Sequence, residues 1–235
     1  MTSDRLLRWL CWAVVGFTIV TAVLTLGLSQ NLFVKFPDVP SGTDLVDRLA
    51  TGRGYDEQVY LLHLGAGFAS IVVYLLAALL GVTLRALASG GAERNVMATL
   101  FVVGGTIGIV SQLVLIAVQQ AATFGYCDCG YRAEELIAQD YALSVGWTIQ
   151  TWLAIGSVTL VGIGVALAGW LVNVSQAWRW LAYGIAVALL VAVVLLVIDQ
   201  GQLANLVVAL ASGIGVPIWA ILLARASRQL TAASA

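Results

Sequence analysis

The chain has 235 residues, of which 61% are hydrophobic and only 10% are charged, and its mean hydropathy is +0.98. Soluble domains carry about 25% charged residues, so this composition excludes an ordinary soluble protein and indicates an integral membrane protein. The formal net charge of −1 argues against a basic nucleic-acid-binding surface and against a polybasic lipid-binding tail.

Six apolar stretches are each long enough to cross a hydrocarbon core of about 30 Å as a helix, which takes about 20 residues. We therefore predict an all-α, polytopic membrane protein with a single domain, a bundle of six transmembrane helices. The first stretch is longer than the roughly 7–15 apolar residues of a signal peptide, so we interpret it as a retained helix. The predicted helices cover approximately residues 9–28, 58–84, 96–122, 142–172, 178–198 and 203–224, with long outer loops at 30–57 and 123–141.

The first long loop, residues 30–57, is rich in proline and glycine, which mark turns. Within it we predict that Thr43 caps a short helix, Asp44 to Ala50, that ends before Gly52. One face of this helix is apolar. It is either an amphipathic helix that lies on the bilayer or caps the bundle, or an element that docks a partner.

Two predicted helices contain features that affect how they pack. Gly104 and Gly108 have the small-xxx-small spacing that lets helices approach closely in lipid, so we interpret them as a packing face. In the last helix, Pro217 cannot donate a hydrogen bond to the carbonyl of Gly213, which predicts a kink or local unwinding. Broken helices also form substrate sites in transporters, but no matching break or internal repeat supports that interpretation here.

The distribution of basic residues predicts the orientation. Because cytoplasmic loops are enriched in Lys and Arg, the side with more of them is assigned to the cytoplasm, which places both termini there. The predicted inner residues are Arg5, Arg8, Arg85, Arg94, Arg179, Arg225 and Arg228, and the outer ones are Lys35, Arg48, Arg53 and Arg132. Ten of the 12 acidic residues fall outside, so the outer face is acidic. Tryptophans also fit two interfacial belts, with Trp147 outside and Trp9, Trp12, Trp170, Trp178 and Trp180 inside.

Polar residues gather near the predicted outer ends of helices two to six. Such groups are costly in hydrocarbon unless they are paired, hydrated or face a cavity. They either form hydrogen bonds between helices or line an outward-opening vestibule that binds a ligand, and both interpretations remain open. The candidates are His63, Gln112, Gln119, Gln120, Gln150, Asp199, Gln202 and Asn205.

His63 is the only histidine in the chain. One histidine excludes bis-histidine haem within this chain and leaves no second histidine for a zinc-hydrolase site. It either makes a structural hydrogen bond or takes part in proton transfer. For the second role, the carboxylates at comparable predicted depth are Asp56, Glu57 and Asp199.

Cys127 and Cys129 lie in the second long loop, on the predicted oxidising side, whereas Cys11 lies in the first helix and is expected in the core. A disulfide across one intervening residue would close a small, strained ring. Three alternatives remain for the pair: a strained disulfide, free or partner-linked thiols, or a redox or soft-metal site. Asp128 between them disfavours thiolate formation and so weakens the last alternative.

Two segments resemble an uncharacterised bacterial family of small six-helix integral membrane proteins. They are residues 169–183, GWLVNVSQAWRWLAY, and residues 74–85, YLLAALLGVTLR. The resemblance implies the same six-helix fold and a bacterial membrane. It implies no activity, and the Cys127–Cys129 loop has no counterpart in it.

No nucleotide-binding, nucleophile-elbow or zinc-protease motif is present, so the sequence does not favour an enzyme and identifies no cofactor. We predict a multi-pass protein of the bacterial plasma membrane that acts as an accessory or interaction protein, as a subunit of a larger complex. The expected partners are the lipid bilayer and other membrane proteins or further copies of this chain, and no nucleic acid. The alternatives are a small-molecule or lipid-binding protein or transporter that uses the vestibule, and a thiol-redox or soft-metal site at the Cys-Asp-Cys loop.

Overall fold

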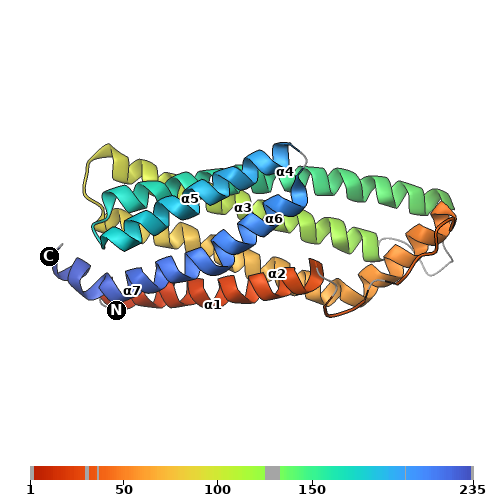
Figure 1. Ribbon diagram of the computed structural model, residues 1–235, viewed down its shortest axis with the longest axis horizontal. Helices are drawn as coiled ribbons and strands as arrows, with labels where there is room; N and C mark the ends of the chain where they lie inside the picture. Colours follow the sequence, from red (N-terminus) through yellow and green to blue (C-terminus); the bar gives the residue numbers. More distant parts are fainter. Residues whose placement is uncertain (1–2, 30–31, 36, 125–132, 199, 234–235) are drawn as a thin grey trace.

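The computed structural model describes all residues except 1–2, 30–31, 36, 125–132, 199 and 234–235 (Figure 1). Its regular structure, within the described residues, is entirely helical. Six helical segments are long and apolar enough to cross a membrane, as predicted. The elements are α1 (Ser3–Ser29), α2 (Leu45–Leu87), α3 (Ala92–Phe124), α4 (Ala133–Leu171), α5 (Gln176–Val197), α6 (Gly201–Leu210), the π-helical turn η1 (Ala211–Gly215) and α7 (Val216–Ala233).

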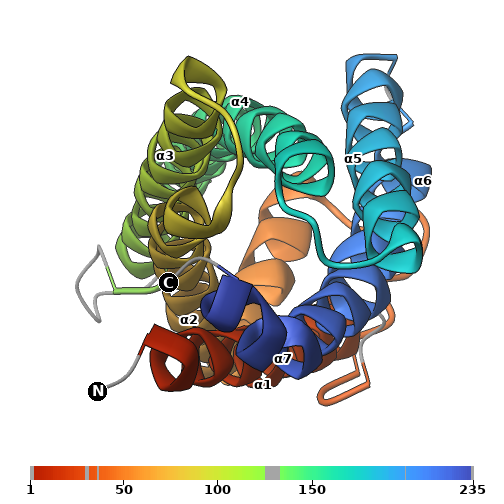
Figure 2. The ribbon, with the colours of Figure 1, turned by 90° about the vertical axis from the view of Figure 1, so that its left-hand side faces the viewer.

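The helices form a ring in chain order, and α7 closes it by packing against α1 (Figure 2). The start of α1 and the end of α7 lie at the same end of the bundle, which we call the terminal end (Figure 1). The short α2–α3 and α4–α5 connections also lie there. We call the opposite end the loop end. The distribution of basic residues predicts that this end faces the outside, and that orientation stays a prediction.

The α1 helix shows why the ring holds together. Its buried side chains include Leu7, Leu10, Cys11 and Val14, spaced three and four residues apart so that they share one face. Trp9 is exposed on another face, where lipid would contact it. The expectation that Cys11 is a core residue is therefore confirmed.

Glycines allow α3 to approach both of its neighbours. A Cβ atom on Gly105 would lie 2.7 Å from the backbone oxygen of Tyr74 in α2, and one on Gly108 would lie 2.4 Å from the Tyr74 ring. A Cβ atom on Gly104 would instead meet Val161 of α4 at 2.9 Å. The packing role predicted for Gly104 and Gly108 is confirmed, but the two glycines face different helices.

The loop predicted at residues 30–57 differs most from the structure. The α2 helix begins at Leu45 rather than near Gln58, and it passes through Gly52 and Gly54 without a break. Glycine lowers helix stability by about 1 kcal/mol relative to alanine but does not forbid the helix. Neither glycine adopts a positive φ, so both fit the helical backbone.

The start of α2 also differs in its cap. Asp44, not Thr43, occupies the N-cap position, and its side chain makes no capping hydrogen bond. The Thr43 hydroxyl instead donates to the backbone oxygen of Pro40 at 2.8 Å. The loop predicted at residues 123–141 is likewise too long, because α4 begins at Ala133 rather than near Ala142.

The last span is irregular where Pro217 predicted it. The π-helical turn η1 immediately precedes Pro217, and the Val216 amide donates to the carbonyl of Ala211, five residues back. Since Pro217 has no amide hydrogen, the helix cannot continue its regular pattern through this point. The irregular turn separates α6 from α7 and confirms the predicted local unwinding.

A buried tryptophan pair joins α5 to α7 near the terminal end. The Trp178 and Trp219 rings stack with centroids 5.1 Å apart and planes 18° apart. The Trp178 indole also donates to the backbone oxygen of Trp219 at 3.1 Å. Ser175 caps α5 by accepting a hydrogen bond from the Trp178 amide at 3.2 Å. Both the amide and the side chain of Trp178 are therefore held in place in the first turn of α5.

Candidate functional site

The predicted vestibule residues are placed on four different helices. His63 on α2, and Gln112 and Gln119 on α3, are half-buried, whereas Gln120 is exposed. Gln202 on α6 lies in the described backbone but its side chain lies outside the described part. The same holds for Asn205, and Asp199 lies outside the described residues altogether.

Gln150 on α4 is the vestibule candidate whose contacts are clearest. Its side-chain amide donates to the Ser111 hydroxyl at 3.3 Å, and that hydroxyl donates to the Gln150 backbone oxygen at 3.1 Å. Ser111 is fully buried on α3. These two bonds link α3 to α4 and support the interpretation of Gln150 as an interhelical hydrogen-bonding residue.

The surface carries two open grooves, and none of the described vestibule candidates lines either of them. The first groove, of about 310 Å³, lies between α4 and α5 and is mostly apolar. Its two threonine hydroxyls donate to carbonyls of their own helix, so their hydrogens are not available to a ligand. The groove is lined by Trp147, Thr148, Thr151, Trp152, Ile155, Leu196 and Val197. The second, of about 320 Å³, lies between α2 and α3 near the terminal end.

At the loop end, α2 and α4 extend beyond the other helices (Figure 1). Crossing the hydrocarbon core takes about 20 residues. However, α2 has 43 residues and α4 has 39. Part of each helix is therefore available outside the core, and we call residues 45–62 of α2 and 133–146 of α4 the projecting helix pair.

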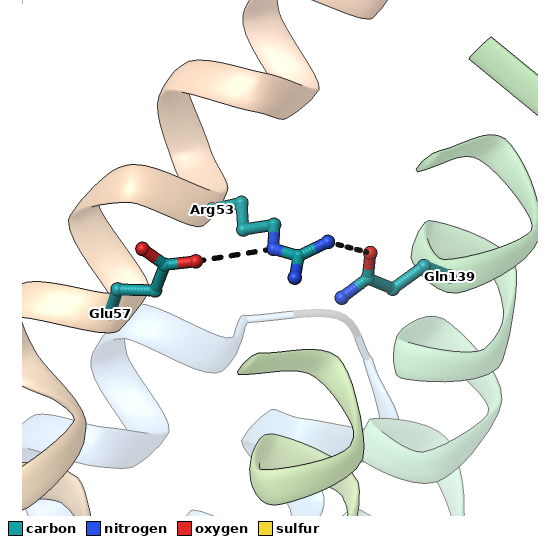
Figure 3. Close-up of polar contacts among 3 residues, drawn as sticks. All are labelled: Arg53, Glu57 and Gln139. Atoms are coloured by element: carbon teal, nitrogen blue, oxygen red, sulfur yellow. Dashed lines mark hydrogen bonds and ion pairs between the residues drawn. The ribbon is translucent and has the colours of Figure 1, made fainter. Parts of the chain in front are cut away.

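A polar bridge connects the projecting helix pair (Figure 3). The Arg53 guanidinium on α2 donates to the Glu57 carboxylate at 3.3 Å, one turn along the same helix. The Nη1 atom of the same guanidinium donates to the side-chain oxygen of Gln139 on α4 at 3.4 Å. The Arg53 side chain is only 10% exposed. Such a nearly buried charge holds its position through several partners.

The sequence analysis missed the bridge for an identifiable reason. Arg53 and Glu57 have the i, i+4 spacing of a helical ion pair, which would have been informative had the segment been predicted as helix. The glycines at 52 and 54 led instead to a predicted loop. Gln139 carries no local signal, since its partner is 86 residues away in the chain.

The bridge predicts a selective loss of stability. Replacing Arg53 with Met removes both hydrogen bonds and leaves the Gln139 oxygen without this donor, so we expect a loss of about 1–2 kcal/mol. Thermal unfolding in detergent is the measurement. Arg48→Met is the matched control, because Arg48 lies exposed on the same helix. Equal effects of the two substitutions would contradict a specific role for Arg53.

The projecting helix pair also exposes apolar side chains. Ile137, Tyr141 and Val145 follow one another at four-residue intervals on α4 and are 49%, 72% and 43% exposed. This spacing places them on one helix face, which we call the α4 stripe. Glu134 and Asp140, both exposed, lie beside it. The arrangement offers an apolar contact surface with negative charge at its edge.

Within the described residues, no group of three or more His, Cys, Asp and Glu side chains is arranged to hold a metal ion. Cys127 and Cys129 lie outside those residues, so the three alternatives for the pair stay predictions. His63 also stays without an assigned chemical role.

The fold defines the class: this is an all-helical protein with six helices able to span a membrane. Comparison with known proteins found no matching family, no matching curated protein and no matching solved structure. The resemblance carried by residues 74–85 and 169–183 therefore rests on those residues alone.

Proposed function

We propose that this protein is an accessory subunit of a membrane complex, and that its projecting helix pair binds a basic, partly apolar segment of a second membrane protein. The observation that carries the proposal is the α4 stripe, an exposed apolar face on a helix that is about twice as long as a membrane crossing requires.

The tryptophans of α4 support a position for the stripe outside the hydrocarbon. Trp147 and Trp170 are both exposed. The helix between them is roughly 35 Å long, which matches a hydrocarbon core of about 30 Å with an interfacial tryptophan at each boundary. On this placement, Ile137 and Tyr141 lie about 15 Å and 9 Å beyond Trp147, outside the hydrocarbon, and Val145 lies at the interface. An exposed apolar row in such a position is a feature of interaction surfaces.

Charge indicates the chemistry of the partner. Residues 133–147 of α4 contain no Lys or Arg. Among the side chains that the structure describes at the loop end, the exposed acidic ones are Asp38, Asp44, Asp47, Asp56, Glu57, Glu134 and Asp140, and the exposed basic ones are Lys35 and Arg48. A partner segment with Lys or Arg beside apolar residues complements this surface. Two copies of this acidic surface would repel each other, so we propose a different protein as the partner.

The Arg53 bridge adds to the suitability of this surface for binding. It ties α2 to α4 at the level of Gln139, two residues from Ile137 along α4. A contact surface that is already ordered loses less conformational entropy when a partner binds. The bridge therefore pre-organises the stripe without taking part in the contact itself.

Site-specific photo-crosslinking in native membranes tests the proposal. With the photoreactive residue at position 141, we expect an adduct with one other membrane protein, identified by mass spectrometry. That protein, once purified, should bind wild-type protein and lose about tenfold or more in affinity for the Asp140→Lys variant, because the variant removes charge complementarity. High salt should weaken the wild-type complex.

Two controls make the result specific. A photoreactive residue at Val191, exposed on the lipid-facing side of α5, should not give the same adduct. Asp38→Lys, an equal charge change in the connection before α2 rather than on α4, should leave the affinity within about twofold. An adduct containing only this chain, no adduct at all, or equal loss with Asp38→Lys would contradict the proposal.

A further inference from the structure

The groove between α2 and α3 combines a positively charged side chain with an apolar surface. It has a volume of about 320 Å³ and opens on the perimeter of the bundle, away from the bundle interior. Its lining residues come from the last turns of α2 and the first turns of α3, on either side of the short connection between them. They are Val82, Arg85, Asn95, Ala98, Thr99 and Val102.

The groove changes in polarity along its length. Because α2 and α3 run in opposite directions, Arg85 and Asn95 lie together near the connection, at the terminal end. Val82 lies about one turn deeper than Arg85, and Val102 lies about two turns deeper than Asn95. Both valines are exposed on the bundle surface. One end of the groove is therefore charged and polar, and the other is apolar and open to lipid.

Three polar side chains of the groove are available to a ligand. Among the described residues, Arg85, Asn95 and Thr99 make no side-chain hydrogen bond or ion pair, and all three are exposed. Two neighbouring threonines behave differently, since the hydroxyls of Thr83 and Thr106 donate to carbonyls of their own helices. The groove thus offers a guanidinium, an amide and a hydroxyl around one opening.

We propose that this groove binds one anionic phospholipid from the surrounding bilayer. The guanidinium of Arg85 holds the phosphate, with Asn95 and Thr99 as further hydrogen-bond donors. One acyl chain lies along Val82, Ala98 and Val102. An arginine at the interface pairs with phosphate through charge-assisted hydrogen bonds, and basic pockets between transmembrane helices recognise anionic headgroups in this way. The site does not depend on the proposed protein partner.

The position of the groove along the membrane span favours a lipid over a soluble phosphate. The α2 segment that ends at Leu87 is a membrane span, so Arg85 lies within one turn of its end, where headgroups are found. The deeper half of the groove faces the hydrocarbon and would stay exposed to it if only a free phosphate were bound. The α4–α5 groove has no comparable cation among its lining residues, so it carries no such preference.

Native mass spectrometry of the delipidated protein in detergent tests the inference. The probes are phosphatidylglycerol and phosphatidylcholine with identical acyl chains. We expect one phosphatidylglycerol molecule to be retained at collision energies that remove phosphatidylcholine. Arg85→Gln should weaken this first binding event about tenfold, because it removes the phosphate's ionic partner. Val102→Trp should weaken it by filling the apolar half of the groove.

The matched control is Arg225→Gln, which removes one positive charge from α7, also near the terminal end, without touching the groove. It should leave retention within about twofold. Equal retention of the two lipids would overturn the proposal, as would equal loss in Arg85→Gln and Arg225→Gln. Displacement of phosphatidylglycerol by inorganic phosphate alone would also overturn it, since it would identify a phosphate site rather than a lipid site. If Val102→Trp does not fold, the two charge variants still decide the outcome.

Discussion

Replacing Trp178 with Ala is expected to lower the free energy of unfolding by about 3–5 kcal/mol, the cost typical of removing a fully buried large aromatic side chain. Trp178 is fully buried and stacks on Trp219 across the α5–α7 interface. The substitution also removes the indole hydrogen bond to the backbone of α7. Thermal or denaturant-induced unfolding in a fixed detergent is the measurement.

Two related substitutions separate the causes. Trp180→Ala changes the same residue type two positions along, where the side chain is 65% exposed, and is expected to cost less than about 1 kcal/mol. Trp178→Phe keeps an aromatic ring but loses the donor, so its effect should fall between the other two. The stacked pair would not be a main stabilising contact if Trp178→Ala and Trp180→Ala lowered stability equally.

Gly105→Val is expected to disrupt the α2–α3 interface. The first atom of any side chain at this position would lie 2.7 Å from the Tyr74 backbone oxygen, and a backbone atom cannot move aside as a side chain end can. Overpacking in a tight interface costs about 1–3 kcal/mol, and a clash with backbone places this variant at the upper end. We expect a lower midpoint of thermal unfolding and less folded protein after extraction.

The control is Gly184→Val on α5. A Cβ atom there would meet nothing within 4 Å. Its stability should stay within about 1 kcal/mol of wild type, so that the comparison isolates packing from helix propensity. If Gly105→Val extracted and unfolded like Gly184→Val, the close approach of α2 and α3 at Tyr74 would be contradicted.

The spans were predictable because the bilayer imposes a simple constraint. A helix must satisfy its backbone polar groups internally and stay apolar over about 20 residues, and both requirements can be seen in the sequence. Pro217 was equally informative. A proline has no amide hydrogen, so it predicts an irregular helix whichever other helices pack around it. The structure places the π-helical turn directly before it.

The length of α2 was not predictable by the same reasoning. Gly52 and Gly54 have low intrinsic helix propensity, and a local analysis ends the helix there. Contacts with α4 and the i, i+4 pair Arg53–Glu57 stabilise the helix through this segment. The helical structure of residues 45–57 thus depends on tertiary contacts, which explains why local patterns predicted a loop at residues 30–57.

The candidate site was predicted only in part, because a polar residue in a span does not reveal its partner. Gln150 was recognised as an unusual residue for a membrane helix, but the Ser111 hydroxyl that it contacts has no distinguishing pattern. Tyr141 was predicted as the last residue of the loop at 123–141, whereas it lies on α4. Its exposure on the projecting part of α4 depends on where α5 and α6 end, which no local pattern records.

The contact between α1 and α7 has a consequence for biogenesis. The first helix enters the membrane before the other five have been synthesised, yet part of its buried face packs against the last one. The part of α1 that packs against α7 therefore faces lipid or an insertion factor until α7 has been synthesised. A chain that stops short of α7 lacks the closing helix, and its open ring offers quality-control proteases a feature that distinguishes it from the finished protein.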